Sequence, residues 1–249
     1  MIKNITITPG TNTSKILFFK KADLEPFVNH VIPLFGPNGV GKSTLLKELE
    51  KAAQLLTIED PEKLEFYQND KEFKSDIKIT ANDDPIEVFS YYNSTDNFKN
   101  RKPKSVNEAF DPYYMSARFD AMSISEGQSI VYSVFDLLDA LKPGKDSFCK
   151  DDCCNIILLD EIDSGLSIDN IDTVMRKIQY ATRKRNNMQI FLSFNSPRVL
   201  KFFPQVLSMY DGNIHEIHNE DDMMNLINLH KEMFNKARKK SNGRPKIFN

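Results

Sequence analysis

The residues best suited to chemistry in this chain lie in one short glycine-rich stretch. Gly36, Gly41, Lys42 and Ser43 fit the pattern G-x-x-x-x-G-K-[ST]. In that pattern the backbone amides cradle phosphate groups, the lysine reaches the terminal phosphates and the hydroxyl binds Mg²⁺. Three of the nine glycines fall within residues 36–41, and glycine lets a loop curl so that successive N–H groups point inward. The stretch therefore predicts a binding site for the phosphates of a nucleotide.

The segments on both sides of this stretch have the patterns that such a loop needs. The apolar run at 31–35 predicts a strand, and a helical pattern follows with Leu45, Leu46, Leu49 and Ala53 on one face. The N-terminus of a helix adds the positive end of its dipole to the amides of the loop. The residues expected to contact the nucleotide are Gly36, Pro37, Asn38, Gly39, Val40, Gly41, Lys42, Ser43 and Thr44.

A pair of acids far along the chain supplies complementary chemistry. Asp160 and Glu161 follow the continuous apolar run at 155–159, which is typical of a strand buried on both faces. Ligands of α/β sheets bind at the carboxyl ends of the strands. We expect Asp160 to hold Mg²⁺ through water and Glu161 to polarise the water that attacks the γ-phosphate. Adjacent acids at the start of a loop are common, so this interpretation depends on the lysine loop.

A third motif, Ser125-Glu126-Gly127-Gln128, opens a helical pattern. By itself it is a serine-capped helix start. Taken with the phosphate loop before it and the acids after it, it resembles the signature of the ATP-binding cassette (ABC) ATPases. The residues at 163–167 resemble the D-loop of that family, and those at 191–200 resemble its switch region. The resemblance implies a head-to-tail homodimer around two Mg-ATP molecules, in which the signature of one chain contacts the ATP of the other.

The chain departs from the family pattern at several places. Asn195 stands where the family has its switch histidine, and Ile162 stands where proline is usual. By resemblance the catalytic residues are Lys42, Glu161 and Asn195, and the asparagine favours slow hydrolysis. No convincing Q-loop glutamine follows the apolar run at 86–92, where Asn93 and Ser94 occupy the approximate place. Two aromatic residues upstream of the loop, Phe18 and Phe19, are either adenine-stacking side chains or part of a core strand.

The spacing of the motifs indicates a compact member of the family. Only residues 43–124 separate the lysine from the signature serine, so the long coiled-coil arms of the larger members do not fit. The motifs "SEGQ", "LLDEIDSGLS" and "NSP" look more like the soluble overcoming-lysogenisation and SMC-like ATPase heads than a transporter cassette. We expect a stand-alone ATPase that switches an effector protein or a nucleic-acid effector. The alternatives are the nucleotide-binding subunit of an ABC transporter and a nucleotide-gated binding protein with little hydrolysis.

Composition sets further bounds. The formal net charge is −2, and no apolar run approaches the ~18 residues that span a membrane. The start of the chain also lacks a signal-peptide layout, so we expect a cytoplasmic protein without direct membrane insertion. Cys149, Cys153 and Cys154 have no histidine nearby, which favours reduced thiols over a metal site. The basic residues at 236–249 are either a flexible solvated tail or a contact to nucleic acid.

The elements that position these motifs alternate between strand and helix patterns. We therefore expect an α/β P-loop NTPase fold of the ABC type, with a mainly parallel sheet, antiparallel strands at the N-terminus and a small helical subdomain. The chain is expected to be one domain, 1–249, with a helical and signature subdomain inserted at about 59–141.

Residues 59–87 look irregular, and residues 94–120 look like a loop followed by a partly helical region. The expected strands are 2–8, 15–19, 31–35, 86–92, 155–159, 188–194 and 206–210, and the segment 211–217 is expected to pair after an Asp-Gly turn. The remaining expected helices are 125–141, one with Ile168, Ile171, Val174, Met175 and Ile178 on one face, and a closing helix with Met223, Leu226, Ile227 and Met233.

Overall fold

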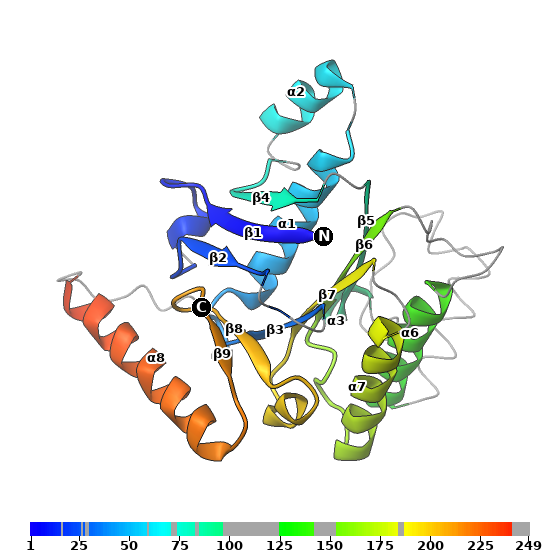
Figure 1. Cartoon of the computed structure of the whole chain (residues 1–249), viewed down its shortest axis with the longest axis vertical. Helices are drawn as coiled ribbons and strands as arrows, with labels where there is room; N and C mark the ends of the chain where they lie inside the picture. Colours follow the sequence, from blue (N-terminus) through cyan, green and yellow to red (C-terminus); the bar gives the residue numbers. More distant parts are fainter. Residues whose placement is uncertain are drawn as a thin grey trace.

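A mainly parallel six-stranded sheet forms the centre of the molecule, with helices on both faces (Figure 1). The computed structural model describes residues 1–15, 17–25, 27, 30–58, 60–70, 74–82, 85–96, 125–141, 153–183 and 187–240. The strands of this sheet lie in the order β5-β6-β7-β3-β8-β9. They are β3 (Val31–Phe35), β5 (Ile86–Tyr92), β6 (Cys154–Asp160), β7 (Met188–Ser193), β8 (Gln205–Ser208) and β9 (Ile214–Glu216).

The parallel pairing explains why the motifs meet. Each neighbouring pair from β5 to β8 in this order is parallel, and only the last pair, β8 and β9, is antiparallel. The turn between β8 and β9 contains Gly212, whose φ of 72° suits glycine. The predicted Asp-Gly turn is therefore confirmed. The carboxyl ends of β3, β6 and β7 lie side by side, and this edge carries the loop at 36–41, the acids at 160–161 and Asn195.

A smaller antiparallel sheet holds the N-terminal segment. It has the order β2-β1-β4, with β1 (Ile2–Ile7), β2 (Lys21–Asp23) and β4 (Ile77–Ala81). The predicted strand at 15–19 is wrong, because β2 takes the place beside β1. Instead, the short 3-10 helix η1 (Thr13–Lys15) begins at Thr13, whose N–H and hydroxyl both donate to the Asp76 carboxylate.

Most of the predicted helices are confirmed. The helices are α1 (Lys42–Leu56), α2 (Pro61–Asn69), α3 (Asn93–Asp96), α6 (Glu126–Ala140), α7 (Ile168–Arg183) and α8 (Glu220–Lys240), with a 3-10 helix η2 (Pro197–Lys201). On α7 the predicted face is buried except for Ile168, which is 63% exposed because it lies at the first residue of the helix. On α8 the predicted face buries Leu226, whereas Met223 and Ile227 are half-buried; the side chain of Met233 lies outside the described residues.

The core has two halves on opposite faces of the main sheet. On one face Ile156 and Leu158 of β6 pack with α1 and the smaller sheet. On the other face Ile157 and Leu159 pack with α6, α7 and the first part of α8. This burial on both faces explains the continuous apolar run of β6.

The predicted insertion at 59–141 is described only in part, and its described residues differ from the predicted irregular stretch at 59–87. In that stretch α2 begins where Asp60 caps its N-terminus, and β4 joins the smaller sheet. The predicted strand at 86–92 is β5 of the main sheet. The predicted loop and helical region at 94–120 lies outside the described residues from 97 onward, and the rest of it belongs to α3. Of the predicted tail at 236–249, residues 236–240 continue α8, and residues 241–249 lie outside the described residues.

Within the described ranges, no helix is long and apolar enough to cross a membrane.

Candidate functional site

The loop at 36–41 connects β3 directly to α1, as predicted. Gly41 caps α1 with φ at 100°, a conformation that favours glycine. At Gly36 a Cβ would come within 2.7 Å of the Val40 side chain and 3.2 Å of Met209, so a larger residue does not fit there. No acidic residue stands in the first turn of α1. The amides and the dipole at this helix start therefore keep their positive potential, which suits an anion.

The Lys42 side chain folds back over this loop. Its Nζ donates to the Gly36 carbonyl at 2.8 Å and to the Pro37 carbonyl at 3.4 Å. Burial lowers the Lys42 pKa, while the nearby carboxylates, the strongest being Glu161, oppose that shift. The amine of Lys42 is therefore buried in this loop, and the neighbouring carboxylates favour its protonated, charged form.

Asp160 and Ser43 meet although 117 positions separate them. The Ser43 hydroxyl donates to Asp160 Oδ1 at 3.0 Å. Ser193, at the end of β7, also donates to Asp160 Oδ1, at 2.5 Å. The Ser193 oxygen in turn accepts the backbone N–H of Glu161 at 2.9 Å. One buried hydroxyl therefore fixes both acids of the pair.

Sequence reasoning missed Ser193. The signal for it was the register of the sheet, because Leu159 pairs with Leu192 and the next positions are Asp160 and Ser193. A polar residue at the end of a buried strand, opposite a carboxylate of the neighbouring strand, indicates a hydrogen-bond partner.

Glu161 lines the same cavity as the loop. The cavity has a volume of about 240 Å³, and its lining residues are Asn38, Gly39, Gly41, Lys42, Ser43, Thr44 and Glu161. The backbone φ of Glu161 is 51°, a left-handed conformation that costs a residue with a Cβ about 1–2 kcal/mol. Strain of this kind persists where the surrounding structure imposes it, and here Ser193 holds the Glu161 N–H.

Asn195 is tied to the D-loop-like segment through its backbone. Asp163 accepts the N–H groups of Asn195, at 2.8 Å, and of Ser196. The Asn195 side chain is exposed and lines a second cavity, of about 320 Å³, together with Gly36 and Pro37. The structure therefore places Asn195 beside the start of the loop rather than in the cavity of Lys42 and Glu161.

The signature-like residues lie at the start of α6. Ser125 accepts the Gln128 N–H at 3.2 Å, and the Gln128 side chain accepts the Ser125 N–H at 3.0 Å, which completes a capping box. A Cβ at Gly127 would come within 2.9 Å of the Gly165 carbonyl oxygen, so this glycine allows α6 to approach the segment at 163–167. Ser125, Glu126 and Gln128 are exposed. None of the four lines the cavity of Lys42 in the same chain.

The two aromatic alternatives upstream of the loop have different outcomes. Phe19 is 3% exposed and belongs to the core. Phe18 is 42% exposed, and its ring centroid lies 5.0 Å from that of Tyr210. Phe18 lines a third cavity, of about 430 Å³, which shares Asn38 and Gly39 with the cavity of Lys42.

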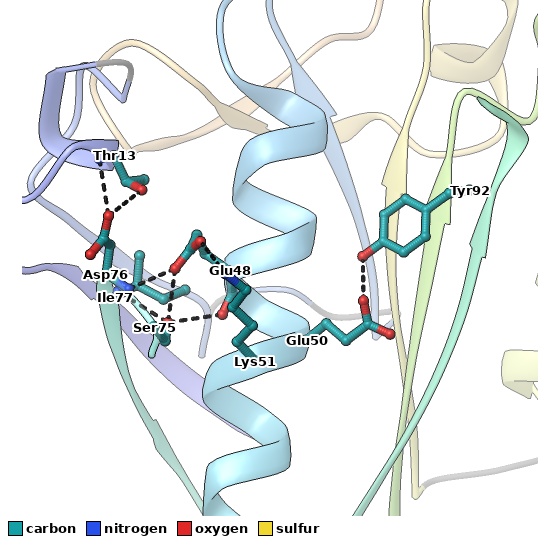
Figure 2. Close-up of polar contacts among 8 residues, drawn as sticks. All are labelled: Thr13, Glu48, Glu50, Lys51, Ser75, Asp76, Ile77 and Tyr92. Atoms are coloured by element: carbon teal, nitrogen blue, oxygen red, sulfur yellow. Dashed lines mark hydrogen bonds and ion pairs between the residues drawn. The ribbon is translucent and has the colours of Figure 1, made fainter. Parts of the chain in front are cut away.

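Acidic residues of α1 fix this helix against both sheets (Figure 2). Tyr92 donates its hydroxyl to Glu50 at 2.9 Å, and Ser90 donates to the same carboxylate at 2.6 Å, which ties α1 to β5. Glu48 accepts the backbone N–H of Asp76 at 2.6 Å, which ties α1 to the start of β4. These contacts set the direction in which the N-terminus of α1 points.

The end of β5 also reaches the site. Tyr92 pairs in register with Asp160, so Asn93, the next residue, lies at the same edge of the sheet. Asn93 is buried, whereas Ser94 is exposed.

The cysteines lie apart from this chemistry. Cys153 and Cys154 are buried, and Cys149 lies outside the described residues. In the part of the chain that the structure describes, no group of three or more His, Cys, Asp or Glu residues is placed to hold a metal ion.

Comparisons with known proteins found similarity at the level of solved structures. No family model matches the chain, and no curated protein matches it. One similar structure is cbiO1 from Clostridium perfringens, part of the ABC transporter complex cbiONQ (16% identity, 94% of each chain covered, TM-score 0.44). Another is a nucleotide-free ATP-binding cassette from an ABC transporter (15% identity, 92% of this chain and 96% of that chain, TM-score 0.40). A third is a dimeric ATP-binding cassette in a post-hydrolysis state, bound to ADP and Pi (14% identity, 88% and 98%, TM-score 0.41). Similarity at this level identifies neither a family nor an activity, so the function has to be argued from the site itself.

Proposed function

We propose that the loop at 36–44 binds Mg-ATP and that the chain hydrolyses it to ADP and phosphate as an ABC-type ATPase. One observation carries this proposal: Lys42, Ser43 and Glu161, from a loop and from a distant strand end, line one cavity. A cation, a hydroxyl and a carboxylate in one cavity at a helix N-terminus are the groups that phosphoryl transfer to water requires.

The residues around Ser43 fit a bound Mg²⁺. Mg²⁺ prefers oxygen ligands and keeps several of its waters, so a hydroxyl with one adjacent carboxylate is a suitable donor set. Ser43 would hold the ion directly, and Asp160 would hold it through water. When bound, Mg²⁺ neutralises charge on the β- and γ-phosphate oxygens.

The other residues of the site would act on the phosphates and on water. Lys42 would exchange its carbonyl partners for oxygens of the terminal phosphates, which are stronger acceptors. Glu161 would accept a proton of the attacking water as a general base. Ser193 would keep the two acids in register, and Phe18 would stack on the base.

We also propose that the working unit is a homodimer. Ser125, Glu126 and Gln128 are exposed at a helix N-terminus and lie outside the cavity of their own chain. A head-to-tail arrangement of two copies would bring this helix start to the γ-phosphate bound by the other copy, where its amides suit an anion.

Asn195 supports a slow cycle. It lies beside the start of the loop and outside the cavity of Lys42, and its amide carries no charge and cannot titrate, so it is a weaker partner for a phosphate oxygen than a histidine at this place would be. The loss of one charge-assisted contact costs about 2–3 kcal/mol, or roughly 30- to 150-fold in rate. A slow ATPase suits a switch for an effector protein better than a pump that cycles for each substrate. The basic residues from 236 onward make nucleic acid a second class of effector.

Isothermal titration calorimetry with Mg-ATP, together with phosphate release under the same conditions, tests the proposal. Lys42→Ala should lose tight binding because the phosphates lose their main cationic partner. Lys63→Ala, on the exposed helix α2, is the matched control and should bind like the wild type. Equal affinity of the Lys42→Ala variant and the wild type would overturn the assignment of the loop.

A further inference from the structure

The C-terminal helix α8 forms one wall of the cavity beside the phosphate loop. Lys231 and Asn235, one helical turn apart, line the cavity of about 430 Å³ that also contains Phe18. The loop itself, from Pro37 to Val40, also lines this cavity. Figure 1 shows α8 on the β9 side of the main sheet, away from α6 and α7. Residues far apart in the sequence therefore line one cavity.

The residue next to Lys231 holds α8 in place. His230 is 3% exposed, and its Nε2 lies 3.0 Å from the Ser208 hydroxyl at the end of β8. Its ring centroid lies 4.1 Å from that of Tyr210, which in turn lies 5.0 Å from that of Phe18. The rings of His230, Tyr210 and Phe18 thus link α8 to Phe18. This packing fixes the backbone position of Lys231, the next residue of α8.

The lining of this cavity has a distinct chemical character. It combines the rings of Phe18 and Tyr210 with one cation, Lys231, and the side-chain amide of Asn235, and none of its described lining residues is acidic. Lys231 is exposed, and no carboxylate among the described residues forms an ion pair with it. A flat ring stacks well on aromatic faces, while an amide and an ammonium group suit the polar atoms at the edge of such a ring.

The neighbouring cavity, which contains Lys42, indicates which group the flat ring of the ligand is attached to. The cavity with Phe18 and the cavity with Lys42 share Asn38 and Gly39, so a ligand whose phosphates lie on Lys42 can extend past these residues towards α8. A nucleotide has this layout, with an anionic chain at one end and a flat base at the other.

We propose that Lys231 and Asn235 of α8 contact the nucleoside half of the nucleotide, an inference that rests on the proposed function of the loop. Phe18 supplies a stacking face, Asn235 donates to and accepts from the edge of the base, and Lys231 donates to acceptor atoms of the base or the ribose. The C-terminal helix is then part of the nucleotide site rather than an appendage of the fold.

Calorimetry with two ligands, Mg-ATP and magnesium tripolyphosphate, tests this inference, because the second ligand has the phosphates without the nucleoside. Lys231→Met removes the charge at similar length and should weaken ATP roughly tenfold, while Lys231→Arg should stay within about threefold of the wild type. Asn235→Ala should weaken ATP about three- to fivefold. Its matched control is Asn228→Ala, an exposed asparagine of α8 outside the cavity lining. Tripolyphosphate should bind all these variants as it binds the wild type.

The outcomes separate this inference from the proposed function. If wild type binds ATP and Lys42→Ala does not, while Lys231→Met and Asn235→Ala bind ATP like the wild type, the loop assignment stands and α8 has no role in binding. If Lys231→Met weakens tripolyphosphate as much as ATP, the lysine acts on phosphates and the nucleoside contact is wrong. If the wild type binds neither ligand, the proposed function fails together with this inference.

Discussion

At the scale of single residues, the site depends on a serine that carries no motif. Ser193 is fully buried and joins Asp160 to the backbone of Glu161 through one hydroxyl. It does not line the cavity of Lys42, so it would act through the two acids and not on the ligand itself. We propose that its role is to position them, since it holds the N–H of Glu161, whose φ of 51° is strained for a residue with a Cβ.

Replacing Ser193 should separate turnover from binding. In Ser193→Ala the Glu161 N–H loses its acceptor and Asp160 loses a donor, so Glu161 is free to leave its left-handed conformation. We expect kcat for ATP hydrolysis to fall about tenfold, equivalent to about 1.4 kcal/mol, with little change in ATP affinity. Ser193→Thr keeps the hydroxyl and should recover most of the turnover in steady-state assays. Equal kcat for the alanine variant and the wild type would contradict this role.

At the scale of elements, the contact between α6 and the D-loop-like segment requires a residue without a side chain. Gly127 faces the Gly165 carbonyl, and a Cβ there would approach the oxygen to 2.9 Å. Because that oxygen belongs to the backbone, it cannot rotate away as a flexible side chain can. The same glycine that by resemblance contacts ATP thus also has a packing role within its own chain.

Gly127→Ala should therefore destabilise the fold. The added methyl group forces α6 away from the segment at 163–167, and overpacking of this kind costs about 1–3 kcal/mol. The measurement is the free energy of unfolding from urea denaturation. Asp136→Ala, at an exposed position of the same helix, should change that free energy by less than about 0.5 kcal/mol. Gly127→Ala with wild-type stability would mean that the helix adjusts without cost.

The elements also show how far the sequence predicted the structure. Strongly patterned elements such as β6 and α6 have boundaries close to those expected, since buried apolar runs and helical stripes follow from burial. The strand expected at 15–19 failed because Leu17 and Phe19 are buried without pairing, and alternation alone cannot tell pairing from burial. The strand β4 was missed because it is short and its pairing with β1 is non-local. In the candidate site, the motif residues can be proposed from the sequence alone, whereas the places of Ser193 and Lys231 depend on which strands and helices become neighbours.

At the scale of the whole molecule, the parallel sheet collects chemistry from distant parts of the chain. The ends of β3, β6 and β7 meet at one edge, so residues of the loop at 36–44, the acids at 160–161 and Ser193 gather there. The start of α6 lies outside the cavity that they form. A single copy therefore presents the proposed phosphate site on one part of its surface and an exposed helix N-terminus on another. In the proposed homodimer, two copies related by a two-fold axis would complete each other's sites.

This arrangement predicts a dimer that depends on ATP and is trapped by loss of the base. In Glu161→Gln the binding groups remain, but the attacking water loses the group that polarises it, so ATP should persist in the site. Size-exclusion chromatography with ATP and Mg²⁺ should show this variant shifting from monomer to dimer, and omission of ATP should abolish the shift.

Adding Ser125→Arg should restore the monomer, because it places bulk and charge where α6 would meet the phosphates of the other copy. Asp136→Arg puts the same side chain on α6 three turns away and should leave the dimer intact, which separates a local block from a general effect of charge. Because Ser125 caps α6, its replacement costs about 1 kcal/mol of stability, so a thermal melt must show that the double variant remains folded. A Glu161→Gln variant that binds ATP in calorimetry but stays monomeric at saturating ATP would rule out the homodimer.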